Sequence, residues 1–284
     1  MIVPTFTAPS TPAPPTQARR FFCTAGYAQG GITRLISPGD IGEITKPFVF
    51  LDRFEFEGGA FPELPMHPHS GIATHTTLLD GWLGYADSTG KSGHLPPRSI
   101  EYMQAGGGVW HTGKPRSGKI RGFQLWLSLP PELELAPAES RYIEPDVIPG
   151  DERVRLLLGT YGSLRSPVPY PAPVTYLHVH LRDGEAWTYE PAPEHDVAWL
   201  AVSVGTVVSD GTEIGKEVAV FEEGNARVDL VAVGDTELVI GSAVKHPHEL
   251  VTGMYSVHTS EDALARGEAG YRRIPKELRS TRAP

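Results

Sequence analysis

The sequence has a single cysteine, Cys23, among its 284 residues. One cysteine cannot form a disulfide within the chain, and it cannot supply the thiolates of a structural zinc site. A disulfide-stabilised scaffold is therefore excluded. Such low cysteine usage is typical of proteins that work in a reducing compartment, so we predict a cytoplasmic protein.

Long apolar runs and long basic runs are also missing. No stretch reaches the roughly 20 apolar residues needed to cross a bilayer, and the first 16 residues lack a charged-then-apolar signal segment. The net charge is −9, from 25 Lys and Arg against 34 Asp and Glu. This balance disfavours nucleic-acid binding through a broad basic surface. We predict no membrane contact and no direct nucleic-acid contact, while contact with protein partners stays open.

Glycine and proline, in contrast, are abundant, with 31 and 27 residues. They punctuate short apolar runs that are rich in β-branched and aromatic side chains, a pattern typical of strands joined by turns. Turn pairs such as Asp80-Gly81 and Asp210-Gly211 separate several of these runs. The predicted strands contain residues 48–51, 76–79, 122–129, 154–158, 174–181, 198–204, 217–221 and 236–240. The pattern predicts an all-β fold of barrels or sandwiches.

The composition divides the chain into two β units. Pro130-Pro131 begins an acidic, proline-bearing stretch that lacks strand character. We predict a mobile tail, a first β unit, a linker, and a second β unit that carries a C-terminal tail, at residues 1–19, 20–130, 131–151 and 152–284. Ser260 is placed to cap a short helix over 261–266 within that tail.

The first unit holds five of the eleven histidines, and four of them, His67, His69, His75 and His111, form a pattern that suits a metal site. Alternate residues of a strand share a face, so positions 67, 69, 71, 73 and 75 would line one face if no bulge intervened. Three of these five positions are His, and the other two are small. Imidazole suits iron, copper, zinc or nickel, and His111 from a distant strand would complete a three-histidine site.

Several motifs occur together in the order found in one known family. They are Phe48-Val49-Phe50-Leu51-Asp52-Arg53-Phe54, His67-Pro68-His69-Ser70-Gly71, Leu78-Leu79-Asp80-Gly81, Asp87-Ser88, the run from Tyr102 to His111, the run from Gln124 to Pro130, and Ser166-Pro167. This ordered set resembles the pirin family, over residues 20 to 280 and most specifically between 48 and 130.

The resemblance implies a bicupin, in which two β-barrels face each other and the N-terminal barrel holds one metal, commonly iron. By motif, the three metal-binding histidines of the family match His67, His69 and His111. Some pirins act as quercetin dioxygenases. Others are iron-dependent, redox-responsive transcriptional co-regulators that act through protein partners.

The sequence departs from the family at two carboxylates. The ligand Glu two residues after the third His is replaced by Gly113, and a Glu four residues after the second His is replaced by Ala73. His75 stands where the family is usually apolar. Three neutral imidazoles without a carboxylate would favour a divalent ion, Fe²⁺ above all, over ferric iron.

Three hypotheses about the site follow. In the first, His67, His69 and His111 hold the metal and water completes its coordination. In the second, His75 or Glu101 compensates for the missing Glu as a ligand or as an acid/base. In the third, the site has lost its metal, and the pocket binds or isomerises a small molecule through His75.

Three functions are then open. The first is a metal-dependent dioxygenase for a small aromatic or enolic substrate, with His75 and Glu101 as catalytic candidates. The second is a metal- or redox-sensing regulator that acts through protein partners, and the third is a metal-free protein that binds or isomerises a small molecule. Gln124 and Trp126 share strand parity and are candidates to line the same pocket, while Trp126 is equally a candidate for the core. His178 and His180 are expected to face solvent or the other unit. The second His-X-His pair, His246 and His248, follows the last strand of the second unit, away from the family's metal position.

Overall fold

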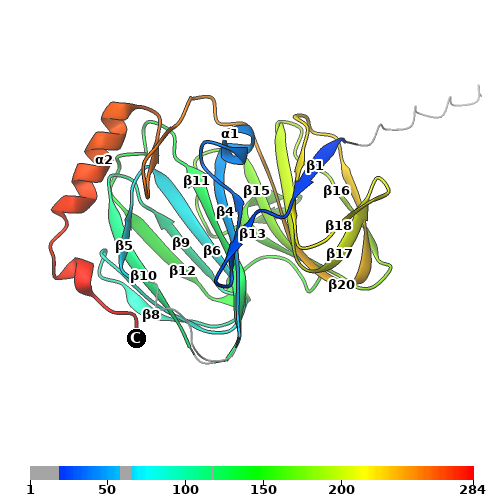
Figure 1. Ribbon diagram of the computed structural model, residues 1–284, viewed down its shortest axis with the longest axis horizontal. Coiled ribbons are helices and arrows are strands. Elements are labelled where there is room, and N and C mark those ends of the chain that lie inside the picture. Colours follow the sequence, from blue (N-terminus) through cyan, green and yellow to red (C-terminus); the bar gives the residue numbers. More distant parts are fainter. Residues whose placement is uncertain (1–18, 58–64, 117) are drawn as a thin grey trace, which may run out of the picture.

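The computed structural model describes residues 19–57, 65–116 and 118–284, and it contains two β units side by side (Figure 1). Each of the eight predicted apolar runs lies in or overlaps a strand, and the all-β prediction is confirmed. Among the described residues no helix is long and apolar enough to cross a membrane.

The first unit is a barrel made of a seven-stranded sheet and a four-stranded sheet. The larger sheet has the order β12-β9-β6-β11-β4-β3-β2. Its strands are β2 (Tyr27–Gln29), β3 (Ile32–Ile36), β4 (Phe48–Phe56), β6 (Ile72–Asp80), β9 (Ile100–Gln104), β11 (Ile120–Ser128) and β12 (Glu139–Ile143). The smaller sheet has the order β5-β10-β7-β8, with β5 (His67–His69), β7 (Leu83–Asp87), β8 (Ser92–Leu95) and β10 (Val109–Pro115).

The second unit is a nine-stranded sheet with the order β1-β19-β17-β20-β15-β13-β14, in which β16 pairs with β20 and β18 with β17. Its strands are β1 (Phe21–Thr24), β13 (Val154–Tyr161), β14 (Leu164–Arg165), β15 (Val174–Leu181), β16 (Ala186–Tyr189), β17 (Val197–Ser209), β18 (Thr212–Ile214), β19 (Val218–Phe221) and β20 (Val228–Ala243). The two residues between β17 and β18, Asp210 and Gly211, both have positive φ, as the tightest hairpin turn requires.

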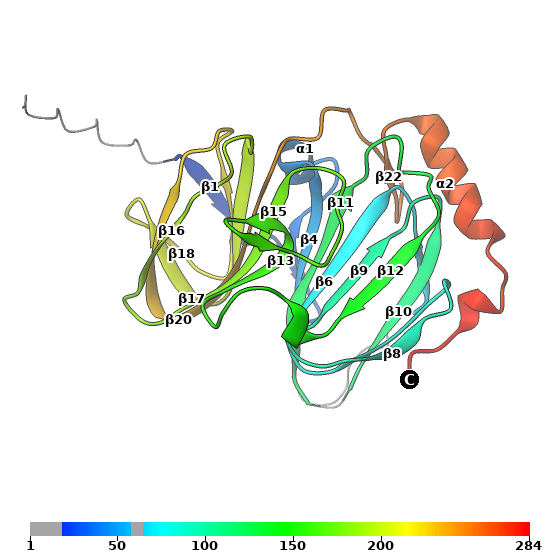
Figure 2. The same ribbon diagram turned by 180° about the vertical axis from the view of Figure 1, so that it is seen from behind.

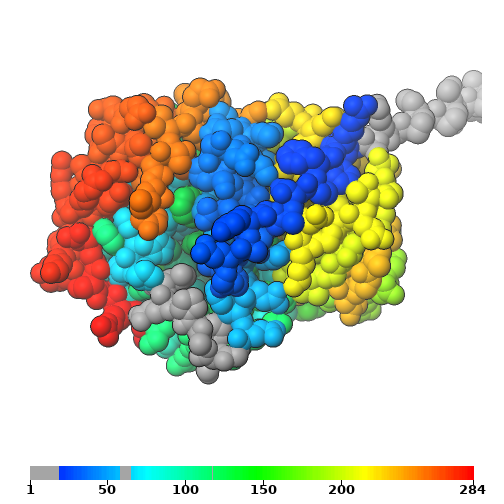
Figure 3. Space-filling view, viewed as in Figure 1, coloured from blue at the N-terminus to red at the C-terminus, as the bar shows by residue number. Residues whose placement is uncertain are grey.

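The two ends of the chain are exchanged between the units, which differs from the predicted boundaries. Strand β1 pairs with β19 of the second unit, although its residues were assigned to the first. Helix α2 (Glu261–Arg273) packs against β5 of the first unit, and the Trp110 Nε1 donates to the Tyr271 carbonyl at 2.8 Å. Figure 3 shows both ends on the surface, the blue strand against the yellow unit and the red segment over the opposite end.

The predicted linker and tail also contain more structure than expected. Strand β12 and the 3-10 helix η1 (Pro145–Val147) lie within residues 131–151, and Figure 2 shows β12 beside β9 at the edge of the first barrel. The predicted mobile tail lies outside the described residues except for Arg19, which is buried and donates to the Glu222 carbonyl at 2.7 Å.

The C-terminal helix begins where the sequence predicts. The Ser260 hydroxyl accepts a hydrogen bond from the Ala263 amide at 3.2 Å, which caps the first turn of α2. The helix continues to Arg273, seven residues beyond the prediction. The remaining short elements are α1 (Ile41–Thr45), β21 (Val251–Thr252), β22 (Val257–His258) and the 3-10 helix η2 (Leu278–Ser280).

Candidate metal centre

His67, His69 and His111 come together on the inner face of the four-stranded sheet. Antiparallel pairing of β5 and β10 places His111 directly opposite His67 and Val109 opposite His69. Because residues 67 and 69 alternate on one strand, both rings face the barrel interior together with His111. One nitrogen from each ring lies within 4.8 Å of the others, and this is the one such group of His, Cys, Asp or Glu among the described residues.

The other nitrogen of each ring is already occupied by an acceptor. The Nδ1 atoms lie 2.9 Å from the Pro65 carbonyl for His67, 3.0 Å from the Tyr255 carbonyl for His69, and 3.2 Å from Glu101 Oε1 for His111. The Nε2 atoms of His69 and His111 are buried, and no group of the described chain bonds to them. Acceptors on Nδ1 fix the tautomer whose Nε2 carries a lone pair, which is the donor set that a metal needs.

Burial keeps the rings of His67 and His69 uncharged. It lowers the pKa of His67 to about 3, with the neighbouring His111 adding to the effect, and it lowers the pKa of His69 well below its usual value. A metal binds imidazole through an unprotonated ring nitrogen, so a charged ring must lose a proton when the metal binds. Rings that are neutral at physiological pH therefore need no deprotonation, and the residues present fit a divalent transition metal.

Glu101 lies behind His111 rather than among the facing nitrogens. It projects from β9, is 4 % exposed, and its Oε2 accepts from the Thr76 hydroxyl at 3.0 Å while Oε1 contacts His111. A carboxylate on the outer nitrogen of a ligand histidine orients the ring and raises its basicity. Glu101 therefore joins the site by its contact with His111, and it also lines the adjoining cavity.

His75 does not lie in the pocket, and the prediction that it shares a face with His67 and His69 is wrong. Gly71 has a φ of +74° and separates β5 from β6, which belong to different sheets, so the alternation does not carry across. The His75 Nε2 lies 3.3 Å from the Leu157 carbonyl, and its ring meets Tyr176 edge-on at 5.2 Å. Both partners belong to the second barrel, so His75 lies between the barrels.

The two lost carboxylates have different consequences. Ala73 has the same parity as His75 and is buried in the apolar cluster between the barrels, so a side chain at that position would not face the cavity. Gly113 does line the cavity, opposite Tyr85 on β7, and a Cβ there would lie 3.3 Å from the nearest Leu83 methyl. Only the change at position 113 alters the wall beside the histidines.

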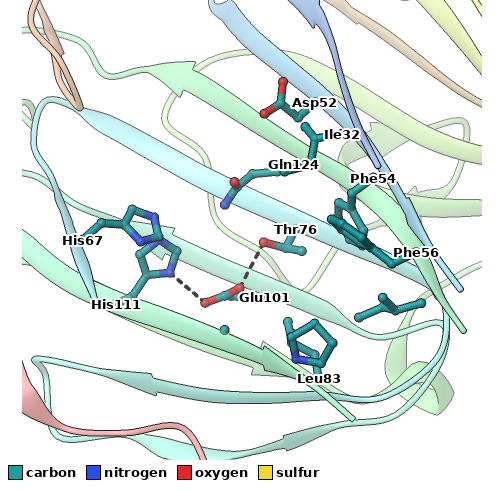
Figure 4. A pocket seen from close by; sticks show the side chains of 13 residues that line it. Ile32, Asp52, Phe54, Phe56, His67, Thr76, Leu83, Glu101, His111 and Gln124 are labelled. Carbon is teal, nitrogen blue, oxygen red and sulfur yellow. Dashed lines mark hydrogen bonds and ion pairs between the residues drawn. The ribbon is translucent and has the colours of Figure 1, made fainter. Parts of the chain in front are cut away.

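A partly open cavity of about 170 Å³ adjoins the histidines (Figure 4). The histidines stand at one end and aromatic side chains at the other, with polar side chains between them. It is lined by Ile32, Asp52, Phe54, Phe56, His67, Thr76, Leu83, Glu101, His111, Gly113, Pro115, Ile120 and Gln124. A second pocket reaches the histidines from outside, lined among others by Arg34, His67, His69, Trp126 and Tyr255. Gln124 lines both pockets and Trp126 the outer one, so both residues line the histidine site as expected.

The remaining histidines form no comparable site with other described residues. His178 faces the first barrel and is buried between the units, where burial lowers its pKa to about 3. The rings of His246 and His248 lie 5.5 Å apart, and in the described part of the chain no third metal-binding side chain joins them.

Sequence reasoning missed the C-terminal hairpin that supports the site. Tyr255, whose carbonyl holds His69, lies 186 residues further along the chain. Next to His69, the Ser70 hydroxyl contacts His258 Nε2 at 3.0 Å, and His258 Nδ1 contacts Glu134 at 3.2 Å. Ser70 and His258 are almost completely buried, so this chain of hydrogen bonds fastens the hairpin to β5. Local patterns carry no signal for a contact of such sequence separation.

Comparisons with known proteins agree with this fold. The Pirin family model matches residues 32–127. Two pirin-like proteins of Caulobacter vibrioides are 29% identical over 259 residues, covering 84% of this chain and 89% of the relative, and 30% identical over 232 residues, covering 76% and 82%.

Two solved structures share the fold. A quercetin 2,3-dioxygenase from Acinetobacter baumannii superimposes with a TM-score of 0.78 at 22% identity, covering 91% of this chain and 95% of that one. The bacterial pirin YhhW from Escherichia coli, in complex with nickel(II), gives 0.61 at 17% identity, covering 80% and 96%. The fold is that of a bicupin. The chain belongs to the pirin family.

Proposed function

We propose that this protein is a metal-dependent dioxygenase that acts on a small aromatic or enolic compound. The observation that carries the proposal is the set of three histidines whose Nδ1 atoms are occupied and whose remaining nitrogens face one another beside a partly open cavity. The similarity in fold to a quercetin 2,3-dioxygenase supports the choice of reaction class.

His67, His69 and His111 would hold the metal through Nε2. The set is uncharged, which favours a divalent ion, and Fe²⁺ is our first choice. When bound, the ion would supply Lewis-acid chemistry and electron transfer between substrate and dioxygen. Both oxygen atoms enter the substrate in such a reaction and the substrate supplies the electrons, so no external reductant is needed.

Glu101 is the residue best placed to accept a proton from a substrate hydroxyl. It lines the cavity, and each of its oxygens retains a lone pair after the bonds to His111 and Thr76. It would also keep His111 oriented throughout. Apolar side chains at the far end, Phe54 and Phe56 among them, would exclude water from the reacting groups.

The test is oxygen consumption by protein loaded anaerobically with Fe²⁺ and then exposed to air with a panel of one-ring enols, catechols and flavonols. We expect turnover that requires iron and disappears in His111→Ala, while His246→Ala, at the second His-X-His pair, retains it. Stoichiometric iron without oxygen uptake on any compound of the panel would contradict the proposal.

A second function, a metal-sensing regulator that acts through a protein partner, is favoured by one observation. The Tyr255 carbonyl that bonds to His69 lies next to Met254, whose side chain is 81 % exposed. Metal binding at His69 would therefore act directly on an exposed loop. Hydrogen exchange of residues 251–258 should slow on metal loading under this proposal, and unchanged exchange would reject it.

A further inference from the structure

The inner wall of the cavity is organised in rows that run across the sheet from strand to strand. Strand pairing places Arg34 opposite Asp52, Asp52 opposite Gln124, Gln124 opposite Thr76, and Thr76 opposite Glu101. These five residues come from β3, β4, β11, β6 and β9, and every one of them is polar. Figure 4 shows four of them, from Asp52 through Gln124 and Thr76 to Glu101, in one line across the cavity.

The neighbouring rows are largely apolar. Two residues further along the strands, toward the aromatic end of the cavity, the row is Ile32, Phe54, Gly122 and Leu78. On the other side the row is Phe50, Trp126, Thr74 and Met103, with Thr74 as its one polar member. The polar row therefore forms a single band between two apolar surfaces. On this sheet a ligand would meet oxygen- and nitrogen-bearing groups along one line only, while His67 and His111 reach the cavity from the four-stranded sheet.

Within the polar row, Gln124 is the member without a protein partner. Arg34 and Asp52 bond to each other, and Thr76 bonds to Glu101. No described residue forms a hydrogen bond with the Gln124 side chain, which points into the cavity between the histidines and the aromatic end. The side chain is half-buried, and its amide is available to a ligand hydroxyl or carbonyl.

The size of the cavity limits the ligand. Its volume is about 170 Å³. A protein cavity of about 150 Å³ accommodates one benzene molecule. A single ring with a few oxygen substituents therefore fills the space, whereas the three rings of a flavonol would require the aromatic end to move. Phe54 lines that end, and its ring lies over Gly122, where a Cβ would come within 2.6 Å of it.

We propose that the cavity takes a single-ring hydroxylated compound, such as a hydroxypyranone or a catechol, and that Gln124 is its specificity-determining residue. The oxygen-bearing edge lies along Gln124, Thr76 and Glu101 and points toward the histidines, and the hydrocarbon edge lies against Phe54. This inference deepens the proposed function and rests on it, because it names the substrate class of the same site.

Calorimetric binding under anaerobic conditions tests the proposal without turnover. Full-length protein loaded with redox-inert Zn²⁺, and the same protein without metal, would be titrated with maltol, a one-ring 3-hydroxy-4-pyranone, and with quercetin, a three-ring flavonol. We expect maltol to bind at least about 10-fold more tightly than quercetin, because only the smaller molecule fits. Gln124→Leu should weaken maltol binding about 3- to 10-fold, since one hydrogen bond is lost.

Enlarging the cavity should reverse the preference. In Phe54→Ala, and in Leu83→Ala, which opens the opposite wall, quercetin binding should improve about 10-fold or more, while Phe22→Ala on β1 should change neither ligand. Thermal melts show whether each variant folds. If Phe54→Ala or Leu83→Ala fails to fold, quercetin binding to the other of these two provides the test. Quercetin binding as tight as maltol in the wild type, or maltol binding unchanged by Gln124→Leu, would overturn the proposal.

The two proposals fail in different ways. Metal content measured in the same samples decides the proposed function, because a protein that takes up no metal cannot be the dioxygenase. Ligand size and the role of Gln124 are read from the ratio of the two affinities, with or without metal. Failure of both ligands to bind either form would overturn the substrate class alone.

Discussion

The two barrels place equivalent strands at the middle of their sheets but point different side chains inward. In the first barrel, β11 lies between β4 and β6 and turns Gln124 and Trp126 toward the interior. In the second, β20 lies between β17 and β15 and turns Leu238 and Ile240 inward, into a continuous apolar cluster. The first barrel therefore has room and donors for a ligand, whereas apolar side chains pack together inside the second.

The two barrels therefore contribute differently: the first provides the binding site, and the second contributes mainly to stability. A filled aliphatic interior contributes stability in proportion to the apolar surface that it removes from water. A cavity that contains unpaired polar groups contributes less to stability, but it can bind a ligand. The first barrel is in turn braced from outside, by the apolar cluster that it shares with the second barrel and by the C-terminal hairpin and helix.

The largest expected effect concerns metal binding. The double variant His67→Ala, His69→Ala should fall from about one equivalent of bound metal to a negligible amount, because two of three ligands are gone. The matched double variant His246→Ala, His248→Ala removes the second His-X-His pair and should keep its metal. Inductively coupled plasma mass spectrometry on protein purified without a histidine tag measures both. Equal metal in the two variants would contradict the assignment of the site.

The next effect is on stability, and it compares the two interiors directly. Leu200→Ala in the filled second barrel should lower the free energy of unfolding by about 2–5 kcal/mol, since it leaves a hole in close packing. Gln124→Leu in the first barrel should change it by no more than about 1 kcal/mol, because the amide has no protein partner to lose. Urea unfolding measures both, and a Gln124→Leu cost as large as that of Leu200→Ala would erase the distinction between the barrels.

A smaller effect is expected from the carboxylate behind His111. Glu101→Gln keeps an oxygen that can accept from His111 Nδ1 but removes the negative charge, so metal affinity should fall about 10- to 100-fold. Competition with a chelator of known affinity measures the change. Glu139→Gln, on the neighbouring strand β12 and largely exposed, is the control and should bind metal normally. An unchanged affinity in Glu101→Gln would remove its role in orienting the ligand.

The smallest effect concerns the interface between the barrels. Burial lowers the pKa of His75 from 6.5 to about 4. The unfolded chain therefore binds the proton more readily than the folded one, and stability falls as pH drops through 6.5 toward 4. Between pH 7 and pH 5 this group should account for about 2 kcal/mol of lost stability.

His75→Gln removes that titration while retaining an amide that can donate to the Leu157 carbonyl. Urea unfolding at pH 7 and pH 5 should show a shallower loss of stability in this variant than in the wild type. His248→Gln, at an exposed histidine, should leave the wild-type slope unchanged. An equal slope in all three proteins would mean that His75 is not held neutral between the barrels.

Much of the fold could be predicted from the sequence because its signals are local. Strand positions follow from the alternation of apolar and turn residues, and the cap of α2 follows from Ser260 and the residues after it. His67 and His69 lie two residues apart on one strand, so their shared orientation needed no tertiary information. The family motifs added His111.

Only the tertiary structure decided which side of the sheet each remaining residue faces and what supports it. One glycine in a left-handed conformation, Gly71, transfers the chain between sheets and sends His75 to the interface instead of the cavity. The carbonyl that holds His69, the single polar row, and the exchange of the chain ends all depend on contacts between residues far apart in sequence. Such contacts are selected by packing of the whole chain, and no local pattern of residues encodes them.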